Sequence, residues 1–154
     1  MSTQTLPLDY ANDLIYEMEK AFFDERGKGA RFRMTTVGRG FYKQNVRPLL
    51  NSDEVDVILS AINEILVEKG IVTRVSYVKE DRLFKIQVKG CIHKSVEDRM
   101  IEKGVEPFTC IPANLIVLAL EDKLDKPVEL AEIKVEEGVC NLLLVLFDKR
   151  PVLD

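Results

Sequence analysis

The sequence lacks most of the features that assign a chain to a common protein class. It contains no glycine-rich phosphate loop, no metalloprotease helix and no serine-nucleophile elbow, and Gly38-Arg39-Gly40 is too short for a dinucleotide fingerprint. Its eight glycines and six prolines in 154 residues are too few for a low-complexity or disordered chain. The common enzyme classes therefore have no support, which favours a binding or sensing domain.

Concentrated positive charge is also missing. The formal net charge is −4, and binding to nucleic acid requires a basic face. The basic residues between positions 26 and 43 form either a solvated helix face or a dock for an anionic ligand or partner. We expect no nucleic-acid partner.

No stretch of the sequence is apolar for long enough to span a membrane. The most apolar helical stretch, Ile111 to Leu120, is far shorter than the roughly 20 residues that a span requires. Residues 1–8 lack the basic start and apolar run of a signal peptide. Three cysteines without an export signal indicate reduced thiols, so we expect a cytoplasmic protein.

Hydrophobic periodicity predicts three helices, a hairpin, two helices and a second hairpin. The expected helices cover 9–23, 30–46, about 55–69, 95–103 and about 111–125, and the expected strands cover 71–79, 82–89, 128–135 and 139–147. This order predicts a single domain of the α+β class, with an antiparallel sheet of about four strands in two hairpins packed against about five helices.

Two details of the first helices bear on function. Leu14, Met18, Ala21 and Phe22, with Ile15 beside them, form an apolar stripe at helical spacing. In the second helix, which also carries Phe41, Gly38 and Gly40 indicate either close approach of another backbone or a ligand, or a kink or helix end.

The residues that can carry chemistry gather between Cys91 and Cys110. His93 is the only histidine and follows Cys91 by two residues, so a thiolate and an imidazole can reach one cation, and Cys110 can join them. The candidates for a fourth ligand are Cys140, Glu132 and Glu136. Three interpretations stay open: buried cysteines with a loop histidine, metal ligation, or a cysteine nucleophile with His93 as its base.

Asn114 lies within the apolar stretch 111–120, where an unpaired amide would be costly. It either caps the preceding loop or faces a polar spot in a pocket.

The C-terminal half resembles the 4-vinyl-reductase-type, or hydrocarbon-binding, domain family. In that family a cysteine follows a strand, a second cysteine opens an apolar helix, and a final hairpin carries further cysteines around a glycine. The positions that match here are Cys91, Cys110, Gly138 and Cys140. The N-terminal half is similar through its helices and the segment Val37 to Gly40.

The resemblance implies a domain that binds apolar small molecules in a helix-lined cavity, forms a homodimer and in some relatives holds a structural zinc. Glu132 matches the glutamate of the zinc-holding relatives, but Val135 occupies the position of their next cysteine. This difference removes one ligand of the family zinc site, and His93 can substitute for it.

Together these observations predict a non-enzymatic domain that binds an apolar small molecule. The pocket is expected between residues 32–42 and 111–120, with Phe41, His93, Cys110 and Asn114 as ligand-binding residues. The alternatives are an enzyme that uses Cys91, His93 and Cys110, with a metal or as a thiol site, and a structural partner-binding subunit.

Overall fold

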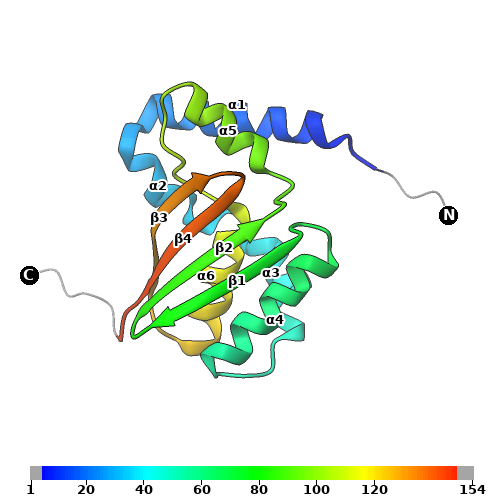
Figure 1. Cartoon of the computed structure of the whole chain (residues 1–154), viewed down its shortest axis with the longest axis vertical. Helices are drawn as coiled ribbons and strands as arrows, with labels where there is room; N and C mark the ends of the chain where they lie inside the picture. The colour runs from blue at the N-terminus through cyan, green and yellow to red at the C-terminus, as the bar shows by residue number, and fades with distance from the viewer. Residues whose placement is uncertain (1–4, 149–154) are drawn as a thin grey trace, which may run out of the picture.

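The protein contains one four-stranded antiparallel sheet, shown in the computed structural model in Figure 1. The model describes residues 5–148, except for the side chain of Phe32, a residue of the predicted pocket helix. The strands β1 (Arg74–Glu80), β2 (Leu83–Lys89), β3 (Val128–Glu136) and β4 (Val139–Leu146) are ordered β1-β2-β4-β3. The two predicted hairpins and the α+β class are confirmed.

The helices are α1 (Leu8–Arg26), α2 (Ala30–Arg33), α3 (Arg39–Asn45), α4 (Val55–Glu68), α5 (Lys94–Glu102) and α6 (Ile111–Leu124). The prediction of one continuous helix over 30–46 is wrong. Met34–Thr36 forms a short 3₁₀ turn, and Gly38 then takes a left-handed conformation with φ 101° before α3 begins. Gly38 therefore marks a helix end, one of the two alternatives for these glycines, and its nearest neighbour is the Leu115 side chain, whose Cδ2 would lie 3.2 Å from a β-carbon on Gly38; Gly40 has open space around it.

The sheet has one face packed against helices. In β2, Phe84, Ile86 and Val88 are buried while the alternate residues are exposed, because successive side chains point to opposite faces. Pairing of β2 with β4 joins the two hairpins and sets Val88 opposite Cys140. In Figure 1, α3, α4 and α6 lie on one side of the sheet, and the opposite side has no helix against it within residues 5–148.

The central helix α6 is buried along most of its length. Every residue from Pro112 to Leu120 is buried, since the helix contacts α3, α4 and β3. Its apolar sequence is thus that of a core helix, as predicted. Within residues 5–148, no helix combines the length and hydrophobicity needed to cross a membrane.

A second, smaller apolar cluster joins α1 and α5 at one end of the sheet (Figure 1). Its buried members are Tyr16, Val96, Met100 and Val105, with Phe23 and Phe108 packed against them. This end of the molecule also contains two buried carboxylic acids, Glu19 on α1 and Glu97 on α5. The α1–α5 pair therefore combines a small apolar core with polar groups removed from water.

Candidate functional site

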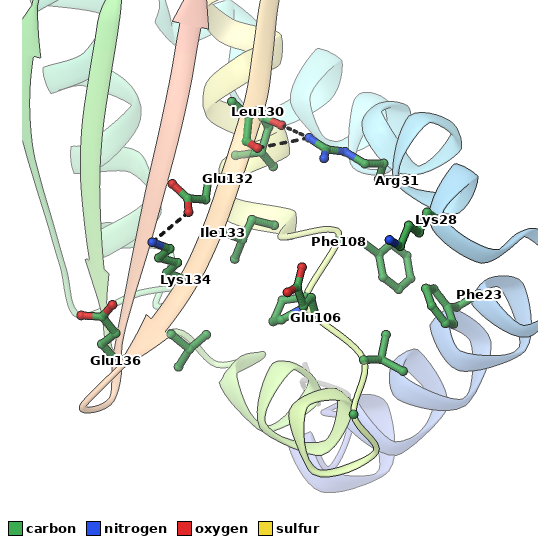
Figure 2. A pocket seen from close by; sticks show the side chains of 15 residues that line it. Phe23, Lys28, Arg31, Glu106, Phe108, Leu130, Glu132, Ile133, Lys134 and Glu136 are labelled. Atoms are coloured by element: carbon green, nitrogen blue, oxygen red, sulfur yellow. Dashed lines mark hydrogen bonds and ion pairs between the residues drawn. The ribbon is translucent and has the colours of Figure 1, made fainter.

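A groove of about 680 Å³ lies between β3, the α1–α2 region and the segment 104–108 that leads toward α6 (Figure 2). We call it the β3 groove. Much of its wall is apolar. The apolar side chains are Leu130, Ile133 and Val135 from β3, Val105, Pro107 and Phe108 from the connecting segment, and Phe23 from α1.

The groove exists because β3 is an edge strand that the helical layer covers incompletely. Ile133 and Val135 pair with Leu142 and Cys140 of β4 and therefore point to the same face of the sheet. Leu142 and Cys140 are each 2% exposed, whereas Ile133 and Val135 remain only partly buried. The apolar face of β3 is thus left open to a ligand.

Two aromatic rings form the wall opposite β3. Phe23 of α1 and Phe108 stack with their ring centroids 5.7 Å apart and an interplanar angle of 27°. Both rings face the groove in Figure 2 and belong to the rim of the α1–α5 cluster. Aromatic walls of this kind give a ligand a large apolar contact area.

Arg31 of α2 connects this wall to the edge strand. Its Nη2 donates hydrogen bonds to the carbonyl oxygens of Leu130, at 3.0 Å, and Ala131, at 3.3 Å. These carbonyls lie at a β-bulge, where the register with β4 shifts between Leu130 and Glu132. The guanidinium thereby satisfies backbone acceptors at the end of the groove (Figure 2).

The charged groups of the groove are at its rim. Lys28, from the turn between α1 and α2, and Glu106 are both exposed. Lys134 pairs with Glu132 at 3.0 Å on the other face of β3. With Arg31 and Glu136, three basic and three acidic residues line the groove beside its apolar side chains.

The pocket predicted between residues 32–42 and 111–120 is present but small. Its volume is about 180 Å³, and Thr35, Thr36, Asn114 and Val117 are among its lining residues. It shares Arg31, Phe108 and Leu130 with the β3 groove, so the two hollows adjoin.

Asn114 mainly stabilises the packing of the 34–37 segment against α6 through hydrogen bonds. Its Nδ2 donates to the carbonyl oxygens of Met34, at 3.0 Å, and Val37, at 3.2 Å, and lies 3.4 Å from Thr109 Oγ1. The side chain thus fastens the 34–37 segment onto α6 and also lines the smaller pocket. Phe41, the other residue predicted in this region, is on the surface, where the Lys69 ammonium lies 6.0 Å from its ring centroid.

His93 is held by a polar contact at the junction of α1 and α5. Its Nδ1 lies 2.9 Å from Asn12 Oδ1, and Asn12 Nδ2 donates to the carbonyl oxygen of Ile92 at 2.7 Å. Burial lowers the pKa of His93 below its ordinary value of 6.5, so the ring is neutral at pH 7. His93 is therefore fixed by α1 and does not face either groove.

The three cysteines lie in or against the main core. Cys110 and Cys140 are each 2% exposed, and Cys91 packs beside them with its sulfur accepting the N–H of His93 at 3.3 Å. Burial raises the pKa of Cys91 to about 11 and of Cys140 to about 12, and raises that of Cys110 well above its ordinary value. The nearby Glu97 carboxylate acts in the same direction on all three. All three thiols are protonated at neutral pH.

The residues do not fit the zinc site that the resemblance implies. Within the described part of the chain, no three or more histidine, cysteine, aspartate or glutamate side chains are grouped so as to hold a metal ion. Glu132 is paired with Leu143, on the face of the sheet opposite to Cys140. Val135, which stands in place of the family cysteine, is instead the partner of Cys140.

Sequence reasoning missed Asn12, Glu97 and the apolar face of β3. Glu97 lies between Val96 and Met100 on the helix face that is buried, and this placement in an amphipathic pattern was the available signal. Asn12 has a comparable position among the buried residues of α1. The alternation in β3 indicates which residues share a face, but nothing local shows that this strand lies at an edge.

No model of a known protein family matches this chain, and no curated protein sequence matches it either.

Proposed function

We propose that this domain binds a small, largely apolar molecule in the β3 groove. The observation that carries the proposal is the volume of about 680 Å³ combined with a wall of incompletely buried apolar side chains. Ligand sites typically have volumes of about 300–1,000 Å³ and largely apolar walls with some polar groups, and the groove has such a volume and an apolar wall bordered by charged residues.

The chemistry of the wall indicates the kind of ligand. Ile133 and Val135 on one side and the stacked Phe23 and Phe108 on the other favour a flat or extended hydrocarbon body. Glu106 is placed to meet a polar end of such a molecule at the rim, where it stays hydrated. Removal of these side chains from water drives binding, since apolar burial contributes about 25 cal/mol per Å².

Thiol catalysis, the enzymatic alternative, has less support. A cysteine nucleophile acts as its thiolate and needs a lowered pKa, whereas burial raises the pKa of Cys91 and Cys110. His93 Nδ1 lies 2.9 Å from Asn12 Oδ1, a contact that in Cys-His-Asn sites orients the imidazole, so the raised thiol pKa is the observation that counts against this alternative. The buried cysteines instead act as small core residues.

Fluorescence titration with N-phenyl-1-naphthylamine tests the proposal, because this apolar dye brightens when it leaves water. We expect saturable binding with one site per chain and a dissociation constant of roughly 10–100 µM, typical of an apolar ligand of this size. In the Ile133→Trp variant the indole occupies the groove, and binding should weaken at least about tenfold.

Val78→Trp provides a matched control. Val78 lies in β1, at the other edge of the sheet, and is 58% exposed, so an indole there leaves the β3 groove open. Dye binding to Val78→Trp should equal that of the wild type. An absence of saturable binding to the wild type would refute the proposal, and so would undiminished binding to a folded Ile133→Trp variant.

A further inference from the structure

The β3 groove runs along the outer edge of strand β3. Every residue of the strand from Leu130 to Glu136 lines it. This includes Glu132, Lys134 and Glu136, although their side chains point to the face of the sheet opposite to Ile133 (Figure 2). These three residues therefore border the groove with their backbone, so the groove follows the edge of the strand as well as its apolar face.

Backbone groups of Ile133 and Val135 point outward from this edge. A two-residue turn with positive φ at both positions joins β3 to β4, so the pair that closes it, Glu136 and Val139, is hydrogen-bonded. The alternation of an antiparallel ladder then turns the N–H and C=O of Ile133 and Val135 away from β4. Within residues 5–148 no hydrogen bond reaches these four groups. An edge with unpaired backbone groups is a template for pairing with another chain.

The end of the groove near Leu130 is closed. Arg31 donates to the carbonyl oxygens of Leu130 and Ala131, so these two acceptors already have a donor. The open part of the edge runs from Glu132 to Glu136 and extends over about 17 Å, at about 3.4 Å per residue. An extended chain segment of about five residues has the same length.

A strand placed in the groove would satisfy both of its walls. Its backbone would pair with Ile133 and Val135, and every second side chain would lie opposite the stacked Phe23 and Phe108. A hydrocarbon covers the apolar wall but offers no hydrogen bond, and backbone groups that lose water without gaining a partner cost free energy. The unpaired edge therefore favours a peptide over a hydrocarbon.

The positive charges on the groove side lie at its closed end. Arg31 is fixed there by Leu130, the exposed Lys28 lies near it in Figure 2, and Glu106 lies farther away. A strand antiparallel to β3 has its carboxyl end at this position, because the chain enters β3 there. A free C-terminal carboxylate would thus lie beside two cations.

We infer that the β3 groove binds the C-terminal segment of another polypeptide, which lies antiparallel to β3 as a fifth strand and has apolar side chains at every second position. This inference rests on the proposed function, because it names the class of apolar ligand for the same groove. The intervening side chains of the bound segment face water beside Glu132 and Lys134 and are polar.

Fluorescence anisotropy measures the binding of a probe peptide to the full chain. The probe is fluorescein-labelled Gly-Val-Thr-Val-Thr-Val with a free C-terminal carboxylate, and its valines match the apolar face of β3. We expect a dissociation constant of roughly 10–100 µM. Ile133→Trp should weaken binding at least about tenfold, whereas Val78→Trp, at the other edge of the sheet, should bind as the wild type does.

Two N-methylated probes test the strand pairing. In the bound strand, the N–H groups of the valines face β3 and those of the threonines face away. A methyl group on the nitrogen of the central valine should weaken binding at least about tenfold, because it removes a hydrogen bond and separates the strands. The same methyl group on the preceding threonine is the matched control and should change the dissociation constant by less than about threefold.

A charge reversal tests the orientation of the peptide. Lys28→Glu should weaken binding of the probe at least about fivefold, because it places a negative charge beside the carboxylate. Lys126→Glu makes the same change at an exposed position outside the groove and should leave binding unchanged.

The possible results separate this inference from the proposed function. Saturable binding of N-phenyl-1-naphthylamine without binding of the probe would overturn the peptide inference and leave the small-molecule proposal intact. Equal binding of the two N-methylated probes, or undiminished binding to Ile133→Trp or Lys28→Glu, would overturn the inference as well. Binding of the probe in the expected pattern without any binding of the dye would instead overturn the small-molecule proposal and leave the peptide site.

Discussion

Replacing Glu97 by glutamine should make the protein more stable at neutral and alkaline pH. Glu97 is 5% exposed, and its Oε2 has no hydrogen-bond partner within the described residues. Burial raises its pKa from the ordinary 4.5 to about 8, and the negative charges of Glu19 and Asp98 act in the same direction. Glutamine has nearly the same shape and never ionises, so the variant removes the cost of keeping this buried carboxyl group protonated when the pH is above its ordinary pKa.

The direction of the pH dependence follows from the raised pKa. Between pH 4.5 and about 8, the folded chain keeps a proton on Glu97 that the unfolded chain releases. The stability that this proton provides is complete below pH 4.5 and is lost as the pH rises through about 8. At about 1.4 kcal/mol per pH unit, the gap between 4.5 and about 8 corresponds to about 5 kcal/mol above pH 8. The corresponding loss at pH 7 is about 3 kcal/mol.

Urea unfolding followed by circular dichroism measures the effect. We expect the wild type and the Glu97→Gln variant to have similar free energies of unfolding at about pH 4.5, and the variant to be more stable by about 3–5 kcal/mol between pH 7 and 9. Glu102→Gln, which replaces an exposed carboxylate on the same helix, should change the stability by less than about 0.5 kcal/mol at each pH. Equal pH dependence in the wild type and Glu97→Gln would refute this account of the buried acid.

Two further substitutions test the close approach of Gly90 to Thr73 and the hydrogen bonds of Asn114 to the 34–37 segment. Gly90→Ala should destabilise the protein by about 3 kcal/mol, because Gly90 has φ +66° and a β-carbon there would lie 1.9 Å from Thr73 Oγ1. Its control is Gly40→Ala, which lies in open space within a helix and should be neutral or stabilising by up to about 1 kcal/mol. Asn114→Ala should lower the free energy of unfolding by about 2–3 kcal/mol, because it leaves two carbonyl groups without their donor. Its control is Asn51→Ala, at an exposed position, which should lower the free energy of unfolding by less than about 0.5 kcal/mol. Thermal or urea unfolding measures both. Equal effects within either pair would contradict the contacts described.

Elements with a strong local pattern could be predicted from the sequence. The apolar residues of α4 recur at helical spacing, and β2 alternates between buried and exposed residues over its whole length. Both patterns follow directly from backbone geometry. The predicted hairpins were found for the same reason, since the turn and the alternation are local.

Features that depend on distant parts of the chain were not predictable. The apolar stripe of α1 suggested its buried face, but Asn12 and Asp13 bind Ile92 and Arg99, more than 75 residues away, and turn Leu14 outward. The order of the strands is equally non-local. Pairing of β2 with β4 leaves β3 at the edge, and this position creates the groove.

The β3 groove was not predicted, because none of the predicted ligand-binding residues Phe41, His93, Cys110 and Asn114 lines it. Asn114 does line a pocket beside the 34–37 segment, but that pocket is the smaller of the two hollows that adjoin at Phe108. Cys91, Cys110 and Cys140 do pack in one region, where burial keeps them protonated. Their chemistry depends on burial and on the neighbouring Glu97, neither of which is encoded in cysteine spacing.

A methyl NMR titration with N-phenyl-1-naphthylamine tests the proposed ligand site most directly, because it locates the dye on the protein. The β3 groove predicts saturable shifts in the methyl signals of Val105, Ile133 and Val135, which line it. Signals of the exposed Val57 and Val78, outside the groove, should remain unchanged. Absence of shifts in the groove signals, or shifts confined to Val57 and Val78, would contradict the claim that this domain binds apolar molecules between β3 and the stacked phenylalanines.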